Sequence, residues 1–180
     1  MDNVERSARE EYVESDGACI WTATQGQGEA LVLLHGGPGG SDQLQPVADM
    51  VDDLAQVHRY EQRGCGRSTG GPAYTVERWL DDLEQLRIHW KHPWWIVFGH
   101  SFGAELALAY AASFSSRARA IIYMSCLPAV LADRRGQEEF VLTAPLGLLS
   151  RCGRVSSSFA DCVMKVANTG HRLSRPNSLA

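Results

Sequence analysis

Apolar residues recur along the first two thirds of the chain in two alternating patterns. Short, continuous apolar runs are typical of parallel strands that are covered on both faces. Spacings of three and four residues are typical of helices with one buried side. After a hairpin, the two patterns alternate, which predicts an α/β fold with a mostly parallel sheet and helices on both faces. The predicted strands are residues 11–15, 18–24, 30–34, 57–61, 94–98 and 120–124, and the predicted helices are 47–54, 76–90 and 102–112.

Local signals support the ends of several of these elements. Asp16-Gly17 lies between the first two strands and is a dipeptide favoured in tight hairpin turns. Pro46 suits the first turn of a helix. The longest helix has Thr75 as its predicted N-cap, and Pro93 is expected to enforce its end. Its apolar stripe is interpreted as core rather than as a cofactor-stacking surface.

The last 30 residues differ in composition from the rest. Acidic residues outnumber basic ones by 20 to 12 over residues 1–150, whereas residues 151–180 hold five basic residues and one acidic residue. Such a break is typical of a linker, a tail or a segment foreign to the fold. Within it, residues 159–167 are predicted to form a short helix that ends before Gly170.

Composition excludes several classes of function. The net charge of −4 makes neither nucleic acid nor an anionic membrane an expected partner. The N-terminal residues lack the apolar centre of a signal peptide, so the cytoplasm is the predicted location. The cysteines are odd in number and form no C-x-x-C pair, so we expect neither disulfides nor a zinc site, and no cofactor. They are Cys19, Cys65, Cys126, Cys152 and Cys162.

The strongest chemical signal is the pattern G-x-S-x-G at Gly99–Gly103, which lies between a predicted strand and a predicted helix. In a nucleophile elbow the chain turns sharply at this point and exposes the serine hydroxyl. Flanking glycines are needed because a Cβ would collide in so tight a turn. Ser101 is therefore the candidate nucleophile, and an ordinary Gly-Ser-rich turn is the alternative.

Three motifs occur in an order that resembles one family. They are His35-Gly-Gly-Pro-Gly39, Tyr60-Glu-Gln-Arg-Gly-Cys-Gly-Arg-Ser68 and Gly99-His-Ser-Phe-Gly103. Together they resemble the proline iminopeptidase-like branch of the α/β-hydrolase superfamily over residues 10–126. Two departures are Glu61, where the family usually has aspartate, and Phe102, where it often has tryptophan. The loop after Tyr60 is interpreted as structural rather than catalytic.

The resemblance implies an oxyanion hole. In an α/β-hydrolase one amide comes from the residue after the serine, here Phe102, and another from the loop after the third strand. Gly36 and Gly37 supply that loop and let the backbone approach a tetrahedral intermediate. A phosphate-binding role fits less well because no Gly-Lys-Ser/Thr follows. His35 precedes the serine, whereas the family's catalytic histidine follows it, so His35 is interpreted as structural.

The rest of the triad is not identified. The fold requires an acid and then a histidine after the serine, following the seventh and eighth strands. Only six strands are predicted by Met124, and the 54 residues from Leu127 to Ala180 cannot hold a cap and two further strand–helix units. We therefore expect a fold truncated before its last two strands, with an open sheet edge prone to association. The remaining candidates are Asp133, Asp161 and His171, and Glu138 and Glu139 are candidates for binding a substrate's free amine.

The resulting prediction is a serine hydrolase that acts by acyl transfer on peptides with a free N-terminus, amides or esters. Small-ester or C–C bond hydrolysis is an alternative, and so is a catalytically inert fragment or binding module. Epoxide hydrolysis is disfavoured because those branches use a carboxylate where this chain has Ser101. The predicted partner is a small-molecule or short-peptide substrate. The expected division is a core over 1–126, the start of a cap over 127–150 and an atypical basic tail over 151–180.

Overall fold

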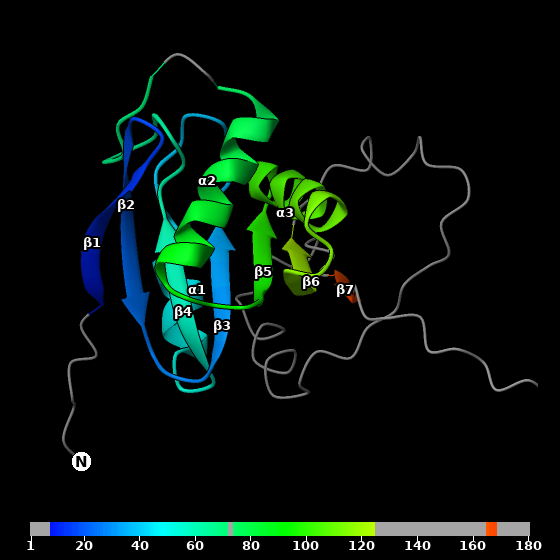
Figure 1. Cartoon of the computed structure of the whole chain (residues 1–180). Helices are drawn as coiled ribbons and strands as arrows, with labels where there is room; N and C mark the ends of the chain where they lie inside the picture. Colours follow the sequence, from blue (N-terminus) through cyan, green and yellow to red (C-terminus); the bar gives the residue numbers. More distant parts are fainter. Residues whose placement is uncertain (1–7, 72–73, 125–164, 169–180) are drawn as a thin grey trace, which may run out of the picture.

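The computed structural model describes residues 8–71, 74–124 and 165–168. The described chain folds into one sheet with three helices packed against it (Figure 1). The elements are β1 (Arg9–Ser15), β2 (Ala18–Gln25), β3 (Glu29–Leu34), α1 (Gln45–Val51), β4 (Ala55–Tyr60), α2 (Val76–His89), β5 (Trp95–His100), α3 (Phe102–Ser113), β6 (Ala118–Met124) and β7 (Lys165–Asn168).

The seven-stranded sheet has the order β1-β2-β4-β3-β5-β6-β7. Four consecutive strands of the sheet, β4, β3, β5 and β6, are parallel to one another. The β1–β2 hairpin pairs with β4 in an antiparallel manner, and β7 pairs antiparallel with β6. The mostly parallel sheet predicted from the alternation of patterns is therefore confirmed, and β3 and β5 lie at its centre.

Helices cover both faces of this sheet, as predicted. Helices α2 and α3 lie on one face and α1 on the other (Figure 1). In β3, Val32 and Leu34 belong to the core under α2 and α3, whereas Leu31 and Leu33 belong to the core under α1. Successive side chains of a strand point to opposite faces, so a strand covered twice must be apolar throughout. This explains the uninterrupted apolar run.

The turn and capping signals of the sequence are also present in the structure. Asp16 and Gly17 have φ of 41° and 74°, the left-handed conformation that a tight hairpin turn requires. The Thr75 side chain accepts a hydrogen bond from the Arg78 N–H at 3.3 Å and caps α2. Trp79 is 9% exposed and belongs to the core, as expected for the apolar stripe.

A buried ion pair fixes the loop that follows β4. Two nitrogens of Arg63 donate to the Asp82 carboxylate of α2, at 3.0 and 2.6 Å. Arg63 also donates to the Ser15 carbonyl at 2.7 Å, and the Ser15 hydroxyl donates to Asp82 at 2.6 Å. The loop is thereby tied to both the hairpin and α2, which supports the structural interpretation made from the sequence.

Glu61, one of the two departures from the family pattern, organises the same loop. Its carboxylate accepts hydrogen bonds from the Asp42 N–H at 3.1 Å and from the Arg67 guanidinium at 3.0 and 3.2 Å. The Arg67 guanidinium in turn lies 3.2 Å from the centroid of the Trp21 ring. A Cβ on Gly66 would overlap the Glu61 carboxylate, so the tight fit requires glycine. The Glu61 side chain, which is longer than the aspartate usual in the family, thus accepts hydrogen bonds with both of its carboxylate oxygens.

Strand β7 corrects the predicted helix and moves the outermost described strand of the sheet from β6 to β7. Residues 165–168 lie partly within the predicted helix, but they form a strand that pairs with Ala120–Tyr123 of β6. The outer edge of β6 is therefore covered rather than open. An unpaired edge offers backbone donors and acceptors to any extended segment, and such pairing overrides a weak local helix propensity. The predicted cap region 127–150 and the rest of the tail lie outside the described residues.

Candidate active site

Ser101 occupies the turn between β5 and α3, at the carboxyl end of a central parallel strand, as predicted. Its φ of 52° and ψ of −119° place it in a region that non-glycine residues rarely adopt. The Ser101 N–H donates to the Met124 carbonyl of β6 at 2.9 Å, and its own carbonyl accepts from the Ala104 N–H at 2.9 Å. Ser101 is half-buried and directly follows the carboxyl end of β5, the edge at which open α/β sheets bind ligands.

The two glycines of the motif permit this turn. A Cβ on Gly99 would overlap the carbonyl of Gly103, and a Cβ on Gly103 would overlap the carbonyl of Leu34. In both cases the obstacle is backbone, which cannot move aside as a flexible side chain can. The start of α3 thus rests directly on β5 and on the end of β3, and this is why glycine stands at both positions.

The glycine loop after β3 lies against the elbow. A Cβ on Gly36 would fall 3.1 Å from the Ser101 Cβ. Gly37 has a φ of 68°, and a Cβ there would meet nothing within 4 Å. Phe102 is the first residue of α3. The structure thus brings Gly36, Ser101 and Phe102 together, as the sequence predicted. The convergence of their N–H groups on one oxyanion remains a prediction.

His35 is completely buried and holds this loop in place. Its Nε2 accepts a hydrogen bond from the Gln62 N–H at 3.0 Å, and its carbonyl accepts one from the Gln62 side chain at 2.9 Å. Its Nδ1 lies 3.0 Å from the Gly36 carbonyl, so Nδ1 carries the proton and the ring is neutral. Burial lowers the pKa of His35. Sequence reasoning missed Gln62, although its place in the second motif was a usable signal.

The candidate acids and bases of the triad cannot be placed. Asp133, Asp161 and His171 lie outside the described residues, and so do Glu138 and Glu139. Within residues 8–71 and 74–124, the hydrogen bonds of the imidazoles go to groups other than the Ser101 hydroxyl. In the same part of the chain, no cluster of three or more His, Cys, Asp or Glu side chains could hold a metal ion. Nor is any described helix long and apolar enough to cross a membrane.

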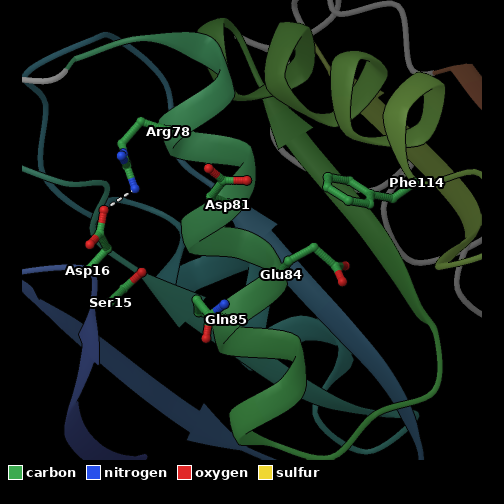
Figure 2. A pocket seen from close by; sticks show the side chains of 7 residues that line it. All are labelled: Ser15, Asp16, Arg78, Asp81, Glu84, Gln85 and Phe114. Atoms are coloured by element: carbon green, nitrogen blue, oxygen red, sulfur yellow. Dashed lines mark hydrogen bonds and ion pairs between the residues drawn. The ribbon is translucent and has the colours of Figure 1, made fainter.

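A shallow hollow of about 520 Å³ lies elsewhere, over α2 (Figure 2). Its lining includes Asp81 and Gln85 of α2 and Phe114, the residue that follows α3. The ion pair between Arg78 and Asp16 lies at its rim. Ser101 precedes α3, and twelve helical residues span about 18 Å. The hollow is therefore at the opposite end of α3 from the serine.

The sequence profile of the alpha/beta hydrolase fold matches residues 29–140. This is more than half of the chain, and the chain belongs to that family of hydrolases. Among curated relatives, the proline iminopeptidase of Saccharolobus solfataricus is 40% identical over 111 residues, covering 59% of this chain and 36% of the relative. The proline iminopeptidase of Arabidopsis thaliana is 37% identical over 100 residues, covering 53% of this chain and 26% of the relative. The chain thus spans about a third or less of the length of these relatives.

Solved structures agree with this assignment. A proline iminopeptidase-related protein from Thermus thermophilus matches with a TM-score of 0.55 and 30% identity, covering 62% of this chain and 42% of that chain. Epoxide hydrolase A from Mycobacterium thermoresistibile matches with a TM-score of 0.60 and 26% identity, covering 64% of this chain and 38% of that chain. The predicted α/β-hydrolase fold and the resemblance to the proline iminopeptidase-like branch are confirmed.

Proposed function

We propose that this chain carries the nucleophile and oxyanion-hole half of a serine hydrolase, with Ser101 as the nucleophile. The observation that carries the proposal is the positive φ of Ser101 at the end of β5, directly against Gly36. A non-glycine residue held in this conformation is a feature of strained functional sites. The substrates proposed are peptides with a free N-terminus, amides or esters, since the curated relatives named above are proline iminopeptidases.

In the proposed reaction, the Ser101 oxygen attacks the carbonyl carbon of the substrate and an acyl-enzyme forms as the amine or alcohol leaves. Water then attacks the acyl-enzyme and releases the acid. The N–H of Phe102 and that of Gly36 or Gly37 would stabilise the oxyanion, each by about 3 kcal/mol. A histidine must take the serine proton, and the described residues do not supply one.

Epoxide hydrolysis is the competing function, because an epoxide hydrolase is among the structural neighbours. The residue after β5 decides between the two. Epoxide hydrolysis of the kind weighed above needs a carboxylate there, whereas this chain has Ser101. Serine chemistry is therefore preferred.

The test is covalent labelling of the purified chain with a fluorophosphonate, followed by mass spectrometry of the labelled peptide. We expect slow labelling of Ser101, because the proposed oxyanion hole stabilises the adduct although no described histidine takes the serine proton. Ser101→Ala should give no label, and the control Ser115→Ala, which alters an exposed serine beyond α3, should label as the wild type does. Label on other serines at the same rate as on Ser101 would overturn the proposal.

Turnover is a separate expectation. We expect this chain alone to hydrolyse proline p-nitroanilide and p-nitrophenyl esters weakly or not at all, because binding and an oxyanion hole without a triad supply only about 10³–10⁴ over water. Robust turnover that is lost in both Ser101→Ala and His171→Ala would show instead that His171 is the base and that the chain is a compact working hydrolase.

A further inference from the structure

The imidazole of His100 packs between the elbow and the glycine loop. A Cβ on Gly36 would fall 2.9 Å from the His100 Nδ1 and 3.2 Å from the His100 carbonyl oxygen. The Gly36 backbone therefore rests against the His100 ring. The Nδ1 atom is buried and has no hydrogen-bond partner. Buried polar atoms in this position are rare and call for an explanation.

The two histidines beside this loop differ in how they are used. His35 has both ring nitrogens engaged, one with Gln62 and one with the Gly36 carbonyl. His100 contacts Gly36 from the side of β5, and its Nδ1 makes no hydrogen bond. The loop is thus held by hydrogen bonds of His35 on one side and by packing against His100 on the other.

We propose that His100 is a positioning residue, whose neutral imidazole sets how closely the Gly36–Gly37 peptide approaches the Ser101 hydroxyl. Its role in catalysis rests on the proposed function, but its effect on the loop does not. A proton on Nδ1 would face the Gly36 Cα, where no acceptor is available. The residue is half-buried, but its Nδ1 atom is buried without a partner, so we expect protonation of His100 to weaken this packing and shift the loop.

The electrostatic surroundings agree with a neutral ring. Burial lowers the pKa of His100, and no charged group of the described residues offsets it. The elements packed against it carry His35 on the loop and Glu105 in the first turn of α3. Burial also lowers the pKa of His35, where Asp42 and Glu61 oppose the effect. Neutral imidazole is therefore the form present at pH 7.

The test follows the loop directly by nuclear magnetic resonance of the ¹⁵N-labelled full chain. The amide shifts of Gly36 and Gly37 are recorded from pH 8 to pH 5 in the wild type, in His100→Gln and in the control His89→Gln. His89 lies on α2, where its Nε2 is 3.5 Å from Glu11. We expect both glycine shifts in the wild type to follow the His100 ring signals, with a midpoint below 6.5. His100→Gln should move the Gly36 signal and abolish its pH dependence, whereas His89→Gln should do neither.

The proposal would be overturned if the amide shifts of Gly36 and Gly37 did not follow the His100 titration, or if their pH dependence persisted in His100→Gln. The wild-type titration alone decides the question if His100→Gln fails to fold. Fluorophosphonate labelling separates this proposal from the proposed function. Absence of label on Ser101, with glycine shifts that follow His100, would overturn the proposed serine chemistry but support the positioning role of His100. If both hold, His100→Gln should slow labelling about tenfold to hundredfold, because a misplaced donor loses much of its effect.

Discussion

At the scale of single residues, the conformation of Ser101 depends on its neighbours rather than on its own preference. A positive φ in a non-glycine residue costs about 1–3 kcal/mol and persists only where surrounding contacts enforce it. Here the Ser101 N–H is held by the Met124 carbonyl, and Gly103 lets α3 begin against the end of β3. The position of the hydroxyl is therefore set by backbone packing on two neighbouring strands.

Gly103→Ala tests this dependence. The new methyl group would overlap the Leu34 carbonyl, and neither backbone can give way, so we expect a loss of about 3 kcal/mol or more in the free energy of unfolding. Gly71→Ala is the matched control, because its Cβ would meet nothing within 4 Å. Urea denaturation measures both, and equal losses would contradict the packing argument.

A second residue-scale feature is the contact of the buried His58 with the half-buried His92. The His58 ring stacks on Trp90, with ring centroids 4.1 Å apart. Its Nε2 lies 2.9 Å from the His92 Nε2, and its Nδ1 lies 2.9 Å from the Thr24 hydroxyl. Burial, and then the neighbouring His92, lower the pKa of His58 from 6.5 to about 3. The folded protein therefore holds this imidazole neutral.

This pair makes stability depend on pH. Below pH 6.5, His58 binds a proton in the unfolded chain but not in the folded protein. The contribution of neutral His58 to the free energy of unfolding is therefore present above pH 6.5 and is lost as the pH falls toward 3. One such group changes the free energy of unfolding by up to about 1.4 kcal/mol per pH unit. We expect His58→Gln to reduce the slope between pH 6.5 and 5, and Ser115→Ala, which removes no titratable group, to leave it unchanged. Identical slopes in all three proteins, from urea unfolding, would refute this assignment.

At the scale of elements, Arg63 and Asp82 join three parts that the chain places far apart. They connect the loop after β4 to α2, and through the Ser15 carbonyl to the hairpin. Both side chains are 4% exposed or less. Removal of one partner from such a pair leaves a buried charge uncompensated, which is more costly than the loss of the pair as a whole.

Arg63→Met should therefore lower the free energy of unfolding by about 3–5 kcal/mol. The double variant Arg63→Met/Asp82→Leu should recover part of that loss, since no charge then remains. Arg78→Met is the control, because the Arg78–Asp16 pair is largely exposed and worth less than about 1 kcal/mol (Figure 2). A double variant less stable than either single change would count against the argument.

Strand β7 allows a further prediction at this scale. Val166 pairs with Ile122 of β6, and a proline there removes a backbone donor from the pairing. We expect Val166→Pro to expose the edge of β6 and to raise the fraction of associated protein in light scattering, whereas Val166→Thr should behave as the wild type. Unchanged association in the proline variant would show that β7 does not protect this edge.

At the scale of the whole molecule, the sequence predicted the features that depend on residues close to one another along the chain. The elbow at Ser101, the cap at Thr75 and the order of strands and helices up to β6 all follow from local patterns. Contacts between distant segments could not be predicted in this way. Nothing in the sequence pairs Arg63 with Asp82, and the helical pattern before Gly170 gave no sign that β7 would pair with β6.

The central place of β3 has a consequence for synthesis. This strand is made early, yet one of its edges pairs with β5, which follows only after β4 and α2. At about 5–20 residues per second, the ribosome needs several seconds to supply that partner. During this interval the apolar run of Leu31–Leu34 has one edge unpaired. Of the strands described, β3 is therefore the one that a chaperone would most usefully shield while the chain is still being made.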